Sequence, residues 1–152
     1  PYDRYMQPVE QVLRRLNGTK PDYDRVAGLL RQAYAFEYVF DTPYVASSPR
    51  ETEARQAGDC KAKSLWLAEK MNDPNIRYVI GKAHRNSRIS HAWLMWKHNG
   101  QWWVLDPTNL NRPVPASRVG PDEYLINYSY TRAGSFRHAP VHGRGVVADS
   151  YR

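Results

Sequence analysis

The chain has 152 residues, of which 41% are hydrophobic and 12% aromatic, enough for one well-buried core and too few for two comfortable domains. Lys and Arg number 22 against 15 Asp and Glu, and the resulting net charge of +7 allows an acidic partner or an anionic surface without requiring either. No stretch approaches the length of a transmembrane span, and a single cysteine excludes an intramolecular disulfide framework.

The N-terminus carries neither a methionine nor an apolar signal segment, since the chain begins at Pro1. We therefore expect a processed or trimmed product, from which any export signal has already been removed. The lone cysteine does not identify the compartment, because exported proteins need not carry disulfides. An extracytoplasmic or periplasmic location stays open.

The first forty residues favour two short helices. Apolar residues recur at positions i, i+3, i+4 and i+7 after Pro8, so residues 8–16 are expected to form an amphipathic helix. A second helix is expected to begin near Pro21. Residues 36–40, which follow it, are aromatic and typical of an extended segment.

A third helix is predicted from Cys60 to Met71. Residues 41–58 before it form a polar connection, in which Pro49 opens a short turn or helix. Asp59 is a suitable N-cap for the third helix. Its core-facing positions are Ala62, Leu65, Trp66 and Ala68. The positions expected to reach water are Lys61, Lys63, Glu69 and Lys70.

The second half of the chain favours strands rich in β-branched and aromatic residues. They are expected at residues 76–80, 89–97, 102–105 and 124–130. Asn99-Gly100 is a strong signal for a two-residue hairpin turn. Helices followed by an antiparallel sheet indicate an α+β fold, in which the N-terminal helices and the cysteine-bearing helix pack on the sheet.

We expect one domain over residues 1–133 and a weakly structured, basic C-terminal extension over residues 134–152. The extension contains His138 and His142, which are four residues apart. Pro140 lies between them and opposes a helix there, so they are interpreted as tail residues and no metal site is predicted.

Cys60 is a candidate nucleophile because of its position. A thiol on the first turn of a helix feels the positive end of the helix dipole, which favours the thiolate, and Lys61 and Lys63 add positive charge nearby. The alternative is a buried, inert cysteine, which is the commoner role of a lone cysteine.

The predicted hairpin brings a histidine and an aspartate together. If Asn99 and Gly100 are the central turn residues, facing residue numbers sum to 199. The side chains that then share one face are those of His91, Trp93, Asp106 and Thr108. His91 and Asp106 become diagonal neighbours that an imidazole and a carboxylate can bridge. A bulge that shifts the register by one residue would separate them.

These three residue types suit thiol chemistry. An aspartate that holds one imidazole nitrogen leaves the other to take the thiol proton, and it stabilises the imidazolium of the ion pair. Taken singly, His91 could be an ordinary sheet histidine, and Asp106 an ordinary strand terminator before Pro107. Their occurrence together with Cys60 favours a catalytic triad.

The middle of the chain resembles the transglutaminase-like superfamily, which has a papain-like core. The matching segments are Ser48-Pro49-Arg50-Glu51-Thr52, Gly58-Asp59-Cys60, residues 76–81, His91-Ala92-Trp93, Gly100-Gln101-Trp102 and Leu105-Asp106-Pro107-Thr108. They follow the family's order and approximate spacing over residues 48–108. The resemblance implies a papain-like fold, with Cys60 as nucleophile, His91 as general base and acid, and Asp106 as the orienting residue.

The resemblance also bears on activity and metal binding. Many bacterial members are similar to cysteine peptidases more than to protein cross-linkers. Some exported members carry acidic residues directly after the cysteine that help to bind calcium, whereas Lys61 and Ala62 stand at those places here. The calcium site is therefore not expected, and no cofactor is predicted.

The remaining site residues are candidates of lower rank. The backbone N–H of Cys60 is available to a tetrahedral oxyanion, and Gln56 is a candidate second donor, although a solvated loop glutamine is an equal alternative. Trp93 is the best candidate wall of a substrate cleft, together with Thr108 on the same face of the hairpin. Trp96 and Trp103 are expected on the opposite face.

The expected function is thiol-dependent acyl transfer at peptide or isopeptide amide bonds of a peptide or protein substrate. Hydrolysis is preferred, and transfer to an amine, the transglutaminase reaction, is second. The alternative from another class is a catalytically silent binding module of the same fold, whose basic surface engages an anionic polymer or a protein partner. The intact set of Cys60, His91 and Asp106 favours the enzyme, and nucleic acid is not the preferred partner.

Overall fold

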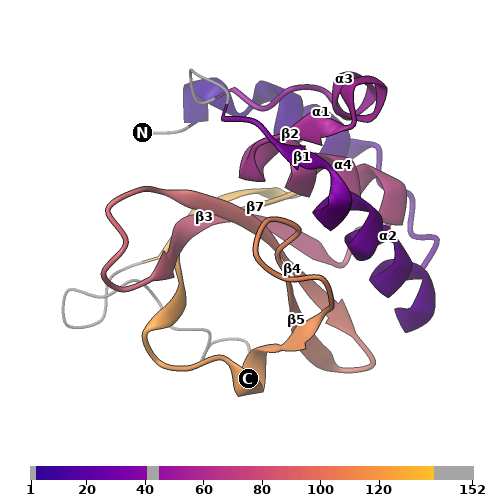
Figure 1. The fold of residues 1–152 in the computed structure, drawn as a ribbon. Coiled ribbons are helices and arrows are strands. Elements are labelled where there is room, and N and C mark those ends of the chain that lie inside the picture. Colours follow the sequence, from indigo (N-terminus) through magenta and orange to yellow (C-terminus); the bar gives the residue numbers. More distant parts are fainter. Residues whose placement is uncertain (1–2, 41–44, 139–152) are drawn as a thin grey trace.

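The computed structural model describes residues 3–40 and 45–138. Helices lie together over one face of a curled antiparallel sheet, as Figure 1 shows. The helices are α1 (Gln7–Arg14), α2 (Tyr23–Ala35), α3 (Pro49–Arg55) and α4 (Cys60–Met71), with short 3₁₀ turns η1 (Asp3–Tyr5) and η2 (Ala116–Arg118). In the described part of the chain, none of the helices has the length and apolar character needed to cross a membrane.

The main sheet has six strands in the order β6-β5-β4-β3-β7-β8, and all neighbouring pairs are antiparallel. These strands are β3 (Ile76–His84), β4 (His91–His98), β5 (Gln101–Leu105), β6 (Val114–Pro115), β7 (Glu123–Thr131) and β8 (Gly134–Arg137). Two short strands, β1 (Glu37–Tyr38) and β2 (Ala57–Gly58), pair in parallel apart from it. The α+β prediction is confirmed.

The sheet separates two apolar clusters. The cluster on the helix side includes Leu65, Trp66, Leu94, Trp96 and Leu105. The cluster on the other side includes Val79, Trp93, Val104, Val119 and Ile126. Because side chains alternate along a strand, β4 contributes to both clusters, and the predicted assignment of Trp93 and Trp96 to opposite faces is confirmed.

The β4–β5 hairpin has the predicted register. Leu94 faces Leu105 and Met95 faces Val104, so facing numbers sum to 199. Both turn residues have positive φ, 51° at Asn99 and 72° at Gly100, as a two-residue turn with this twist requires.

One expectation about the C-terminal region and one about a helix need correction. The extension expected from residue 134 does not begin there, because residues 134–137 form β8 and continue the sheet past β7. His138 also belongs to this region, since its N–H donates to the Asn127 carbonyl, while residues 139–152, including His142, lie outside the described residues. The short edge strand β6 was not foreseen.

Lys63 does not reach water. Its side chain is buried in α4, and its ammonium donates to the Tyr34 carbonyl at the end of α2, at 3.3 Å. α4 lies between α2, α3 and the sheet, so a lysine on its predicted outer face is covered by another helix. A cation at the C-terminal end of α2 is favoured by that helix's dipole.

Candidate active site

Cys60 begins α4, where the chain leaves β2. The predicted N-cap is confirmed, because the Asp59 carboxylate accepts the Ala62 N–H at 3.1 Å. Gly58 allows the close approach of this segment to the helix, since a Cβ there would lie 2.8 Å from the Cβ of Ala62. The Cys60 side chain is mostly buried, with 7% of the residue exposed.

His91 and Asp106 are in direct contact, as the hairpin register predicts. The His91 Nε2 lies 2.8 Å from the Asp106 Oδ2, and Asp106 is fully buried. His91 also makes a side-chain hydrogen bond with Cys60 that raises its pKa. The structure therefore brings Cys60, His91 and Asp106 together.

The charges of the three residues are coupled. Burial, the largest influence, opposes protonation of His91, but the hydrogen bonds and negative charges of Asp106 and Cys60 outweigh it and raise the pKa of His91 to about 10. For Asp106 burial again acts first and favours the neutral acid. Hydrogen bonds and charge from His91, with further bonds from Tyr124 and Thr108, lower the pKa of Asp106 below its ordinary value.

Two residues that the sequence interpretation missed hold the Asp106 carboxylate. The Tyr124 hydroxyl donates to Oδ2 at 2.7 Å, and the Asn109 side-chain amide donates to the same oxygen at 3.1 Å. Tyr124 has φ of 53°, in the left-handed region that non-glycine residues rarely adopt. Asn109 directly follows the matched Asp-Pro-Thr segment, which is the only sequence signal that could have indicated it.

Tyr38 is a third residue that sequence reasoning missed. Burial and the negative charges of Cys60 and Asp59 raise the pKa of the Tyr38 hydroxyl, and hydrogen bonding with the Cys60 backbone offsets part of this rise. The net shift is upward. Tyr38 therefore lies at the N–H that was expected to bind an oxyanion.

Trp93 does not line a cleft, which corrects its prediction as a substrate wall. It is fully buried, and its ring stacks on the His91 ring with centroids 5.7 Å apart. Its other neighbour is the Tyr124 ring, which meets it edge-on at 5.1 Å. The face was assigned correctly, but residues of η2 and β7 cover it. Trp93 therefore packs against the His91 ring and restricts its position.

The other two lower-rank candidates also have structural roles. The Thr108 N–H donates to the Asp106 Oδ1 at 3.0 Å, whereas its hydroxyl is buried and is not presented to a cleft. Gln56 ends α3 in a left-handed conformation, and its side-chain amide donates to the Glu53 carbonyl at 2.7 Å. This contact belongs to the helix end, and a role for Gln56 as oxyanion donor stays a prediction.

The calcium ligands of the resembled family do not fit this chain. Calcium takes oxygen ligands, mainly carboxylates and carbonyls. Directly after the cysteine, Lys61 instead places an ammonium in an ion pair with the Asp59 carboxylate. A cation at this carboxylate would meet a positive charge already bound there. Among residues 3–40 and 45–138, no three His, Cys, Asp or Glu side chains are grouped so that they could hold a metal ion.

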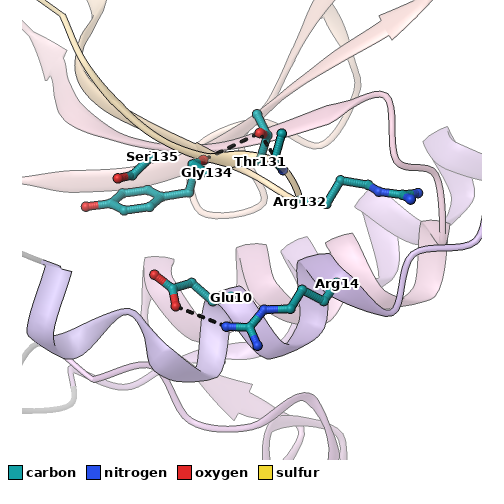
Figure 2. Close-up of a pocket in the computed structure, with 8 residues that line it drawn as sticks. Glu10, Arg14, Thr131, Arg132, Gly134 and Ser135 are labelled. Atoms are coloured by element: carbon teal, nitrogen blue, oxygen red, sulfur yellow. Dashed lines mark hydrogen bonds and ion pairs between the residues drawn. The ribbon is translucent and has the colours of Figure 1, made fainter.

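A separate cavity of about 250 Å³ lies between α1 and the β7–β8 turn. Figure 2 shows Glu10 and Arg14 on the helix below it and Thr131, Arg132 and Ser135 above it. Arg14 is paired with Glu10 at 3.4 Å, and Arg132 donates to the Leu16 carbonyl. The cavity adjoins the end of β7 opposite to Tyr124 and contributes nothing to the triad.

Comparison with known proteins shows which solved structures share this fold. No family model and no curated protein matches the sequence. Among solved structures, Legionella pneumophila LapG superposes with a TM-score of 0.65 at 16% identity, over 90% of this chain and 77% of that chain. Its calcium-bound form gives 0.63 at 17% identity, over 95% of this chain and 80% of that one.

A protein from Cytophaga hutchinsonii, described as a candidate cysteine protease, matches with a TM-score of 0.51 at 22% identity. The match covers 74% of this chain and 42% of that protein, so the likeness spans less than half of its length. At these identities the likenesses show the fold alone. The fold is transglutaminase-like, as the resemblance implied.

Proposed function

We propose that the protein is a cysteine-peptidase-like enzyme, in which Cys60 attacks a peptide or isopeptide carbonyl. The observation that carries this proposal is the continuous chain of contacts from the Cys60 thiol through the His91 ring to the buried Asp106 carboxylate. The raised pKa of His91 keeps the ring protonated at neutral pH, as an imidazolium paired with a thiolate would be. The fold shared with a candidate cysteine protease adds support.

The reaction follows from the positions of these groups. The Cys60 sulfur bonds to the carbonyl carbon, and the Cys60 N–H stabilises the oxygen as it gains negative charge. His91 gives its proton to the leaving amine as the carbon–nitrogen bond breaks, which leaves a thioester. Water then attacks the thioester while His91 takes its proton, and the acid is released as the sulfur recovers the thiolate. An amine in place of water would give the transferase reaction.

The experiment is alkylation of Cys60 by iodoacetamide between pH 5 and 9, followed by mass spectrometry. The chain has one cysteine, so the labelled site is unambiguous. We expect rapid labelling at pH 6 in the wild type. In His91→Ala, labelling should rise only toward the ~8.5 pKa of an ordinary thiol. His98→Ala, at the far end of the hairpin, is the matched control and should leave the profile unchanged.

Slow labelling at pH 6 in the folded wild type would contradict the enzyme. The binding module then becomes the better account, and the net charge of +7 is the observation that favours it. Its signature would be a gel shift with an anionic polymer that weakens steeply with salt. Circular dichroism of each variant verifies that the fold is kept.

A further inference from the structure

Exposed apolar side chains gather beside the nucleophile. Among the described residues, the large hydrophobic side chains that remain substantially exposed are Tyr34, Tyr38, Val39, Phe40, Val45, Ile89 and Phe136. Five of these seven fall between residues 34 and 45. Single exposed apolar residues are ordinary, but a group of them marks a surface that contacts something else.

Three contacts attach the middle of this group to Cys60. Tyr38 pairs with Gly58, two residues before the cysteine, and the Val39 N–H donates to the Gly58 carbonyl at 3.2 Å. The Phe40 ring centroid lies 5.8 Å from the Lys61 ammonium, one residue after the cysteine. Residues 38–40, here called the apolar lip, thus run alongside the start of α4, with Phe40 68% exposed.

The lip lies on the acyl side of the site. The Cys60 N–H is the group from which the substrate's carbonyl oxygen would accept a hydrogen bond, and the lip runs beside it, since Tyr38 pairs with Gly58 two residues earlier. An acyl group whose oxygen accepts this N–H must therefore lie against the lip. The leaving amine faces His91 instead.

We propose that the apolar lip is the acyl-side subsite, and that the site prefers peptides with a bulky apolar residue directly before the scissile amide. Lys61 does not make the lip a site for acidic residues, because its ammonium is already paired with Asp59. This inference rests on the proposed function, since it needs Cys60 to be the attacking atom.

The test uses peptide chloromethyl ketones, which place one chosen residue on the acyl side. The Cys60 sulfur bonds to the methylene carbon and displaces chloride, so labelling needs no known substrate. We expect the Leu and Phe probes to label about 10-fold faster than the Asp or Gly probes. Phe40→Ala should remove most of this preference, so that the Leu, Phe, Asp and Gly probes label at similar rates.

Phe136→Ala is the matched control, because Phe136 is an exposed aromatic on β8 outside the lip, and the preference should persist in it. Iodoacetamide separates the two proposals. Rapid labelling by iodoacetamide with no preference among the probes, or a preference unchanged in Phe40→Ala, overturns the apolar subsite and leaves the enzyme intact. Slow labelling by iodoacetamide overturns the proposed function itself.

Discussion

Five hydrogen bonds converge on the two oxygens of Asp106. The Oδ2 atom contacts His91, Tyr124 and the Asn109 side chain, and Oδ1 accepts the backbone N–H groups of Thr108 and Asn109. A fully buried carboxylate loses its hydration, and such donors replace it. They also fix its direction, so the carboxylate can hold one orientation of the His91 ring.

Tyr124→Phe tests this arrangement. The substitution keeps the ring against Trp93 and removes the 2.7 Å bond to Asp106. Because that bond lowers the pKa of Asp106, its loss should move the acid limb of the activity profile to higher pH. We expect turnover to fall about 10-fold and stability by about 2 kcal/mol. Tyr23→Phe is the control, because it removes the hydroxyl of another tyrosine, whose ring packs on Trp103 away from Asp106. An unmoved acid limb with full turnover would mean that the hydroxyl does not position Asp106.

The residues of the proposed triad could be named from the sequence because each has a local signal. Cys60 follows an N-cap, and a two-residue turn determines which side chains of the hairpin share a face. Tyr38 has no such signal, since its place depends on pairing between β1 and β2, whose strands are nearly twenty residues apart. The alternation of side chains along a strand also could not predict the left-handed φ of Tyr124, and so could not predict its contact with Asp106.

At the scale of elements, the register of β3 against β7 shifts between Ile80 and Gly81. Gly81 is required there, because a Cβ would lie 2.0 Å from the Leu125 carbonyl oxygen. A backbone atom cannot move aside as a side chain can. This contact is next in the chain to Tyr124, so the irregularity and the left-handed residue together shape the start of β7.

Gly81→Ala should therefore force the two strands apart. We expect a loss of about 3 kcal/mol of stability in urea unfolding, together with slower alkylation of Cys60 as Tyr124 and Asp106 shift. Gly28→Ala is the matched control within α2, where a Cβ meets only the end of the Arg31 side chain at 3.9 Å. That change should stabilise by about 0.5–1 kcal/mol. Equal stability of the two variants would refute the role given to Gly81.

The longer elements and the short helix α3 at Pro49 could be predicted from their start signals, whereas the shortest strands could not. α4 has the predicted bounds, from Cys60 to Met71. The two-residue strand β6 and the four-residue strand β8 carry too few residues for a period to be read. Lys63 was misplaced for another reason, because a helix covered on several sides buries positions that amphipathic spacing assigns to water.

At the scale of the whole molecule, the proposed triad joins the two layers of the fold. Cys60 belongs to the helical layer, whereas His91 lies on β4 and Asp106 follows β5. The contact between His91 and Cys60 therefore links the start of a helix to the start of β4, and its charge state should contribute to global stability.

The sign of that contribution follows from the raised pKa of His91, from an ordinary 6.5 to about 10. A group whose folded-state pKa is raised stabilises the fold fully below its unfolded-state pKa, and the contribution is lost as pH rises through the folded-state pKa. The lowered pKa of Asp106 acts at the other end, since its contribution is lost as the solution becomes acidic.

We expect the unfolding free energy of the wild type, minus that of His91→Gln, to be largest just below pH 6.5 and to decline steadily toward pH 10. Urea unfolding of both proteins at one-unit intervals from pH 5 to 10 measures it, and titratable groups that do not interact with residue 91 cancel in the difference. A difference that grows with pH would require a neutral His91 in the folded protein, and the imidazolium in the proposed reaction would have to be abandoned.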